Sequence, residues 1–236
     1  MAKITKVVGR QVFDSRGNPT VEAEVYLKDK TKALAIVPSG ASTGAFEAYE
    51  LRDNNKNYFL GKSVLNAVNN INTIINKSLK SIDSSKQKKI DEILLNLDGT
   101  ENKKKLGANA LLAVSLAVSK AEAISKKKEL YQHLGKEFLI PKPLMNIING
   151  GAHADNNLRI QEFMIRPDSS KNFMDAMEKS FLVIQNLKKI LHSKNLLTNV
   201  GDEGGFAPSI NSNEEALNLI VDAILKSNLQ PGTDIN

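Results

Sequence analysis

Two adjacent carboxylates stand in a glycine-flanked stretch near the end of the sequence, Asn199-Val-Gly-Asp-Glu-Gly-Gly-Phe206. The residues before it, 197–200, are typical of a strand, so Asp202 and Glu203 would follow the carboxyl end of that strand. Catalytic groups of parallel α/β folds stand at such ends, and flanking glycines let a ligand approach the backbone. Asp and Gly are also the usual residues of surface turns, so this motif alone leaves both interpretations open.

A second carboxylate interrupts an apolar stretch. In Arg159-Ile-Gln-Glu-Phe-Met-Ile165, Gln161 and Glu162 fall inside an expected strand at 160–165. Burying a carboxylate is costly unless it is paired or bound to something. The glutamate is therefore either at a strand end that faces a site or on an exposed edge, and the acidic loop nearby in the chain favours the site.

Two further loops carry groups suited to binding. His153 follows a Gly-Gly pair in Asn149-Gly-Gly-Ala-His-Ala-Asp155, so its imidazole could lie over a pocket, although a lone loop histidine is usually solvated. The loop Val37-Pro-Ser-Gly-Ala-Ser-Thr-Gly44 lacks the Gly-Lys-Ser/Thr of a P-loop, which argues against nucleotide binding. Its small and hydroxyl residues suit a mobile lid that closes on an anion or a metal, with a plain loop as the alternative.

The secondary-structure elements that must position these groups show two different patterns, one in each part of the sequence. In the first, strand-like segments joined by turns predict an antiparallel meander, and an apolar period of 3.6 from residue 63 to 134 predicts helices. Strands followed by helices are typical of an α+β domain. In the second, strands alternate with helices, which indicates a parallel α/β sheet or barrel. The expected strands are 4–13, 20–27, 33–37, 144–148, 160–165 and 197–200, and the later helices are 173–193 and 214–227.

The two patterns predict two domains, 1–134 and 141–236, joined by the proline-containing segment 135–143. Only three strands and two helices follow Pro141, too few to close a (β/α)8 barrel, which needs about 200 residues or more. The second domain is therefore expected to be an incomplete barrel.

Composition excludes several classes of protein. The absence of cysteine rules out disulfides, thiolate nucleophiles and Cys-based zinc sites. The net charge of +6 comes from lysine runs beside helices, and with only 5% aromatic residues the pattern favours solvated helix faces over a nucleic-acid surface. The most apolar stretch, 106–124, is interrupted by polar residues and is expected to be a buried helix rather than a membrane span. The first residues lack the pattern of a signal peptide, so a cytoplasmic location is expected.

Taken together and in order, seven segments of the sequence resemble the signature blocks of the enolase family. The resemblance runs from about Ile4 to the last residue. The blocks are Phe13-Asp-Ser-Arg-Gly-Asn-Pro-Thr-Val-Glu22, Pro38-Ser-Gly-Ala-Ser-Thr-Gly44, Ala48-Tyr-Glu-Leu-Arg-Asp53, Leu106-Gly-Ala-Asn-Ala110, Ile147-Ile-Asn-Gly-Gly-Ala-His-Ala-Asp155, Gln161-Glu-Phe-Met164 and Gly201-Asp-Glu-Gly-Gly-Phe206.

The resemblance implies an α+β N-terminal domain joined to an α/β enolase-type (β/α)8 barrel of atypical topology, here incomplete. It also implies the reversible dehydration of 2-phosphoglycerate to phosphoenolpyruvate in glycolysis, with Mg²⁺ as cofactor. In this reaction a proton is removed from the carbon next to a carboxylate. The negative charge that then develops on the carboxylate must be stabilised electrostatically. Sites of the enolase superfamily use a Lys or His base together with one or two Mg²⁺ ions, so this chemistry is implied by the resemblance and not by the residues themselves.

By motif position, Glu203 resembles the general acid that helps hydroxide leave, with Glu162 as the second carboxylate of the acid site. This pairing suits the role because repulsion between two close carboxylates favours protonation of one of them. The other implied roles are substrate contact for Gln161, a mobile-loop histidine near the phosphate for His153, ligation of the second magnesium for Ser39, the rest of the lid for Gly40, Ala41, Ser42 and Thr43, and salt bridges across a homodimer interface for Arg10 and Glu22.

Two departures from the family's pattern stand out. Arg159 occupies a position that is usually acidic in the family. The base lysine, the three carboxylate ligands of the first magnesium and the phosphate-binding arginine are expected beyond residue 236. The chain should therefore carry the acid half of the site and be inactive alone.

Other functions stay open. The chain could be one half of a split enolase that needs a second chain, or a noncatalytic interaction module. Retention of Gln161, Glu162 and Glu203 argues against a noncatalytic module. A sugar-acid dehydratase of the wider superfamily fits poorly, because the lid and Gly-Asp-Glu-Gly-Gly blocks are those of enolases.

Overall fold

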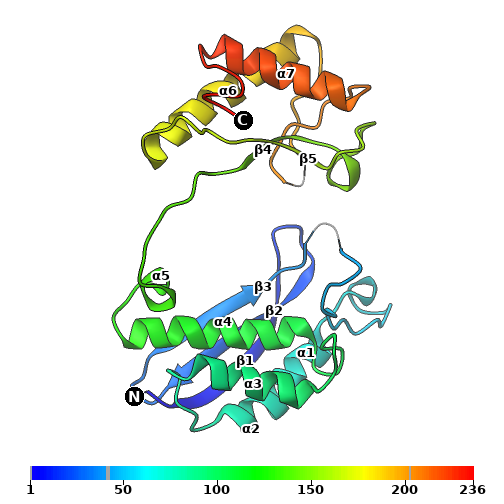
Figure 1. Ribbon diagram of the computed structural model, residues 1–236. Coiled ribbons are helices and arrows are strands. Elements are labelled where there is room, and N and C mark those ends of the chain that lie inside the picture. The colour runs from blue at the N-terminus through cyan, green and yellow to red at the C-terminus, as the bar shows by residue number, and fades with distance from the viewer. Residues whose placement is uncertain (1, 41–42, 202) are drawn as a thin grey trace. The chain divides into compact units, whose positions relative to one another are not determined.

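The computed structural model describes residues 2–40, 43–201 and 203–236 of the chain. These form two compact units, Met1–Phe138 and Leu139–Asn236 (Figure 1). Each unit has its own core of buried apolar side chains.

Unit 1 begins with the predicted antiparallel meander, which the structure confirms. Its sheet has the order β1 (Ile4–Phe13), β2 (Pro19–Leu27) and β3 (Lys32–Val37). The turn between β1 and β2 is held by Asp14, whose carboxylate accepts the backbone N–H groups of Arg16 and Asn18. Gly17 in that turn has φ +74°, a left-handed conformation that glycine adopts without steric cost.

Helices cover one face of this sheet (Figure 1). The longest, α4, packs against β2 and β3, and its buried residues Val114, Ala117 and Ala121 belong to the core. By length and composition α4 could cross a membrane, but most of it is buried inside unit 1, in agreement with the expected buried helix. The helical segments of unit 1 are η1 (Phe59–Gly61), α1 (Leu65–Asn70), the π-helix η2 (Ile71–Ile75), α2 (Asn76–Leu79), α3 (Gln87–Asp98), α4 (Ala108–Ser125) and α5 (Leu130–Leu134).

Unit 2 contains two long helices packed on a two-stranded sheet. Its elements are β4 (Met145–Asn149), the 3-10 turn η3 (Gly151–His153), β5 (Glu162–Ile165), α6 (Phe173–Ser193) and α7 (Asn213–Lys226). Asn172 and Ser212 cap the two helices by accepting the N–H groups of Asp175 and Glu215. Side chains of α6 and α7, among them Leu187 and Ala223, bury the strands.

The expected parallel pairing is wrong for these strands, since β4 and β5 are antiparallel. A parallel pair needs a crossover, usually a helix, whereas the connection 150–161 holds only the turn η3. The strand expected at 197–200 is also wrong: only an isolated bridge forms there, between Val200 and Phe206.

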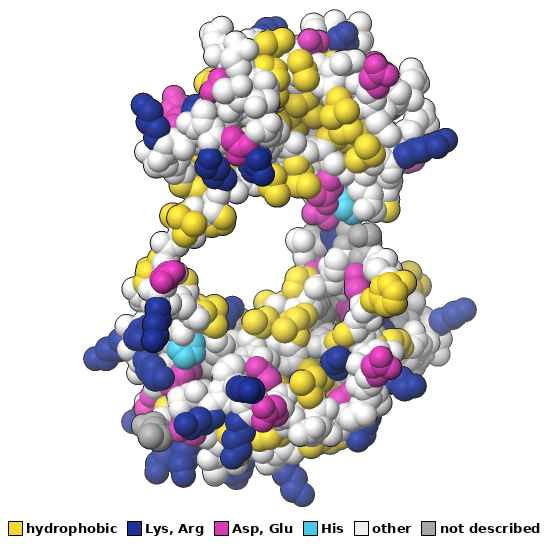
Figure 2. Space-filling model, viewed as in Figure 1, with side chains coloured by type: hydrophobic (Ala, Val, Ile, Leu, Met, Phe, Trp, Pro, Cys, Tyr) yellow, Lys and Arg dark blue, Asp and Glu magenta, His cyan; other side chains and the backbone are white. Residues whose placement is uncertain are grey.

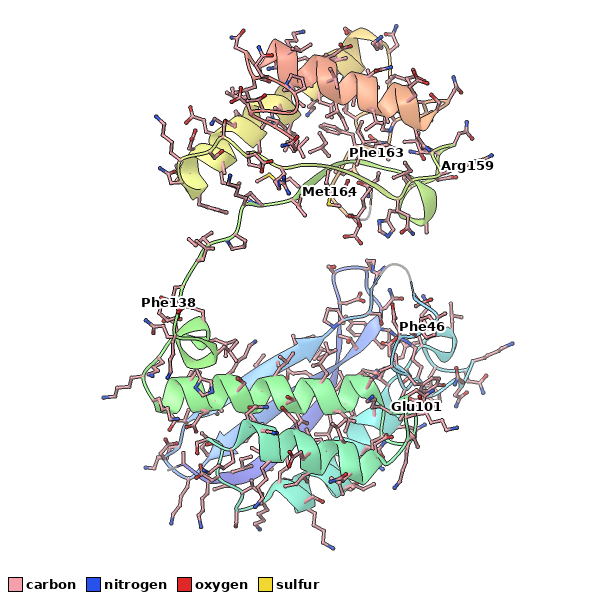
Figure 3. The ribbon with its side chains drawn as sticks, viewed as in Figure 1. Phe46, Glu101, Phe138, Arg159, Phe163 and Met164 are labelled. Carbon is pink, nitrogen blue, oxygen red and sulfur yellow. The ribbon has the colours of Figure 1, made fainter. Side chains whose placement is uncertain are left out.

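A hydrophobic groove lies between β5 and α7. Side chains alternate along β5, so that Phe163 is buried while Met164 is 45% exposed (Figure 3). Met164 lines a cavity of about 210 Å³ together with Leu217 and Val221 of α7. Hydrophobic side chains also gather on the visible face of unit 2 in Figure 2.

The residues expected at a dimer interface, Arg10 and Glu22, bind each other within the chain. In the Arg10 guanidinium, Nη1 lies 2.9 Å from Glu22 Oε1, and Nη2 lies 2.6 Å from Glu24 Oε2. Tyr26 also donates its hydroxyl to Glu24, at 2.8 Å. The hydrogen bond from Arg10, followed by that from Tyr26, holds the pKa of the Glu24 carboxyl below its usual value.

This pairing predicts a pH dependence of stability. Because the pKa of Glu24 is lower in the folded chain than in the unfolded chain, its contribution is complete above the ordinary carboxyl value of 4.5 and is lost as pH falls through the folded value. The variant Glu24→Gln should therefore lose less stability than the original chain as pH falls below 4.5. Urea unfolding of both proteins across this range measures the difference, and parallel curves would contradict it.

Candidate functional site

The predicted residues of unit 2 gather at one end of its small sheet. Glu162, the first residue of β5, lies opposite Asn149, the last residue of β4. The Glu162 side chain is 34% exposed, which fits a strand end that faces a site. The N–H of Gly150 donates to the carbonyl of Gln161, so both predicted residues of this segment are tied to the end of β4.

His153 lies beside Glu162 and is buried, not solvated as an isolated loop histidine would be. Its side chain is only 6% exposed, and Nδ1 lies 3.4 Å from Glu162 Oε1 without forming a hydrogen bond. Among the described residues neither ring nitrogen has a hydrogen-bond partner. Buried polar groups are normally paired, so the two unpaired ring nitrogens are an unusual feature of His153.

The acidic loop forms a small hairpin that docks on β4. The hairpin is closed by the bonds from Gly201 N–H to the Gly205 carbonyl and from Ala207 N–H to the Asn199 carbonyl. Phe206 then binds β4 through the N–H of Asn149 and the carbonyl of Ile147. Glu203 is exposed at the turn of this hairpin, where Gly204 has φ +85°. Asp202 lies outside the described residues.

The hairpin and β5 therefore flank the same end of β4. Adjacent chains in a sheet are about 4.8 Å apart, so the backbones of Glu162 and Phe206 are separated by roughly two such spacings. Among the described residues no hydrogen bond joins the carboxyl groups of Glu162 and Glu203. The structure thus brings their chain segments to the same end of β4, while the chemical roles of the two residues stay predictions.

Asn149 is the residue that sequence reasoning missed at this site. Its side chain is fully buried, and it fills the space between two glycines of the hairpin. A Cβ atom at Gly205 would lie 2.3 Å from Asn149 Oδ1, and one at Gly201 would lie 2.8 Å from Asn149 Nδ2. Asn146 donates to Asn149 Oδ1 at 2.8 Å and holds the amide in place. The tripeptide Asn-Gly-Gly is typical of a turn, so the sequence did not indicate this packing role.

The predicted lid residues lie in unit 1. The carbonyls of Ser39 and Gly40 accept hydrogen bonds from Arg16 Nη2, at 2.6 and 3.0 Å. Thr43 is exposed, and with Ser39 and Gly40 it lines a cavity of about 440 Å³. The other lining residues include Glu47, Tyr49 and Asn109. Ala41 and Ser42 lie outside the described residues.

The predicted metal ligand Ser39 is a poor fit to Mg²⁺. Its hydroxyl donates to Glu50 Oε1 at 2.5 Å and accepts from Arg52 Nη2 at 2.9 Å. A divalent cation at this oxygen would have to displace a guanidinium that already binds it. In the described part of the chain, no group of three or more His, Cys, Asp and Glu side chains could hold a metal ion.

The fold and this geometry define a class of protein: an α+β unit followed by part of an α/β barrel that carries carboxylates and a buried histidine at one end of its strands. Residues 4–134 match the family model for the enolase N-terminal domain, and residues 137–236 match that for the enolase C-terminal TIM barrel domain. The chain belongs to the enolase family.

Comparison with an individual protein also supports membership of the enolase family. The chain is 58% identical over 238 aligned positions to a protein described as enolase from Pelagibacter ubique (strain HTCC1062). The alignment covers all of this chain but 57% of the relative, so the chain spans a little over half the length of the curated relative it matches.

Proposed function

We propose that this chain supplies the acid half of an enolase, which interconverts 2-phosphoglycerate and phosphoenolpyruvate. The observation that carries the proposal is the docking of the Glu203 hairpin and the Glu162 strand on the same end of β4. The identity to a protein described as enolase supports the same reaction.

In this proposal Glu203 donates a proton to the departing hydroxyl, and Glu162 is the second carboxylate of the acid site. An acid positioned at the leaving group lowers the barrier because the oxygen need not leave as free hydroxide. Gln161 contacts the substrate, and His153 lies near its phosphate, where a buried imidazole can donate a hydrogen bond. Gly40 to Thr43 form a lid that limits the entry of water.

The enolase resemblance implies Mg²⁺, which would stabilise the charge that develops on the substrate carboxylate. Because the hydroxyl of Ser39 is already bound by Glu50 and Arg52, the proposal assigns no metal to Ser39. We further propose a cytoplasmic protein with domains 1–134 and 141–236, which forms homodimers through the surface that carries Arg10 and Glu22.

A complementation assay tests the proposed reaction. The chain alone, and the chain mixed with the part of the Pelagibacter ubique relative that follows the aligned region, are incubated with 2-phosphoglycerate and Mg²⁺. We expect no turnover by the chain alone and phosphoenolpyruvate formation by the mixture, because only the mixture contains the predicted base half.

Gel filtration of the same mixture separates failed assembly from failed chemistry. A complex that forms but has no activity would contradict the proposed function and favour the noncatalytic interaction module. Activity of the chain alone would instead contradict the assignment of the base half to a region outside it.

A further inference from the structure

Ser39 is held by a cluster of charged side chains that the proposed reaction does not use. Its hydroxyl lies between Glu50 and Arg52, which also bind each other: Arg52 Nη2 contacts Glu50 Oε1 at 2.8 Å, and Arg52 Nε contacts Glu50 Oε2 at 3.2 Å. The Arg52 side chain is only 19% exposed and that of Glu50 is 32% exposed. The two-point contact fixes the plane of the guanidinium, and partial burial limits screening by water.

Arg52 joins its own segment to three other segments of unit 1. Besides Ser39 and Glu50, its Nη1 donates to the carbonyls of Pro19, at 3.1 Å, and Lys62. The guanidinium thus connects the start of β2, the loop after β3 and the segment before α1. Lysine could not make this set of contacts, because its ammonium lacks the planar fork.

The segment that carries Glu50 is itself fixed to the start of α4. The side chain of Asn109 exchanges two hydrogen bonds with the backbone of Leu51, at 3.2 and 3.1 Å. The carbonyl of Tyr49 accepts from the N–H of Ala108. The acceptor for Ser39 therefore belongs to the rigid part of unit 1.

We propose that Glu50 and Arg52 are positioning residues that anchor the stem of the loop 38–44 through the hydroxyl of Ser39. Arg16 also stabilises the stem, because it donates hydrogen bonds to the carbonyls of Ser39 and Gly40. Ser39 then acts as an anchor and not as a metal ligand. The importance of this anchor for catalysis rests on the proposed function. The existence of the anchor is independent of that function.

Hydrogen exchange of the chain measures the anchor without any activity. In peptides from residues 36–47, Ser39→Ala, Glu50→Gln and Arg52→Lys should each raise the exchange rate by about tenfold, because each removes or weakens a charge-assisted hydrogen bond to the loop. Ser39→Thr keeps the hydroxyl, so its exchange rate in these peptides should equal that of the original chain. The double variant Ser39→Ala with Glu50→Gln should exchange more slowly than the product of the two single effects predicts, because both changes disrupt the contact between Ser39 and Glu50.

Matched controls are Ser78→Ala and Glu92→Gln, which change the same residue types on α2 and α3 of unit 1 and should leave these peptides unchanged. Unchanged exchange in the three anchor variants, or multiplicative effects in the double variant, would overturn the proposal. Circular dichroism of each variant identifies any that fails to fold, and Ser39→Thr then provides the decisive comparison with the original chain.

The metal assignment is tested by calorimetric titration of Mg²⁺ into the complemented two-part protein. If Ser39 is an anchor, Ser39→Ala should change the dissociation constant by no more than Glu50→Gln does. A tenfold weaker affinity for Ser39→Ala, with Glu50→Gln unchanged, would identify Ser39 as a ligand and refute the anchor. This outcome does not depend on turnover, so it is distinguishable from failure of the proposed reaction.

Discussion

Replacement of Glu203 by glutamine should lower the turnover of the complemented protein by about 10²–10⁴-fold, the usual contribution of a positioned general acid. Glutamine has nearly the same size as glutamate, so the hairpin of residues 199–207 should stay docked on β4. It cannot deliver a proton to the departing hydroxyl, so the loss should fall on kcat and not on KM. Steady-state kinetics of the mixture with 2-phosphoglycerate measures both constants.

The matched control is Glu178→Gln, which makes the same change at an exposed position on α6 and should have no effect. Glu162→Gln should also lower kcat, since the proposed acid site contains both carboxylates. If the Glu203→Gln protein kept more than a tenth of the original turnover, Glu203 would not be the acid, even if the family assignment held.

Gly205→Ala should displace the acidic hairpin from β4. The new Cβ would lie 2.3 Å from Asn149 Oδ1 and 2.9 Å from backbone atoms of Ile147 and Ile148, distances at which something must move. Overpacking of this kind typically costs about 1–3 kcal/mol. Because Glu203 is carried by the same hairpin, the complemented protein should also lose most of its turnover. Urea unfolding and the kinetic assay measure the two effects.

Gly135→Ala provides the comparison, because its Cβ would meet only ordinary contacts at 3.8 and 3.9 Å. It should change stability and turnover little. A stable, fully active Gly205→Ala protein would show that the close packing of Asn149 against the hairpin is not needed for the site.

Local patterns predicted most of the secondary structure correctly. The strand Ile4–Phe13 and the helix Phe173–Ser193 have the expected bounds, because amphipathic spacing and capping residues act between neighbours in the chain. The expected parallel pairing of β4 with β5 was wrong, because the direction of a strand depends on the path of its connection and not on its own residues. The expected strand at 197–200 instead became one side of a hairpin stabilised by β4.

Motif order pointed to Gln161, Glu162, His153 and Glu203, and the structure gathers their segments at the end of one strand. The residues that hold them, or hold the lid, were not recognised. In the sequence, Asn149 stood out only as the start of the loop that carries His153, and Glu50 and Arg52 lay in a block that suggested no contact with Ser39. Each of these roles depends on contacts between residues distant in sequence, such as the 13 positions that separate Ser39 from Arg52.

The sequence by itself determined the family, the order of strands and helices, and the residues that could do acid chemistry, because these depend on residue type and on spacing along the chain. Only the tertiary structure decided that His153 is buried beside Glu162, that Asn149 packs into the glycines of the acidic hairpin, and that the hydroxyl of Ser39 is already bound. The physical reason is that burial and hydrogen-bond partners are properties of the folded surroundings, which bring distant segments within a few ångströms of one another.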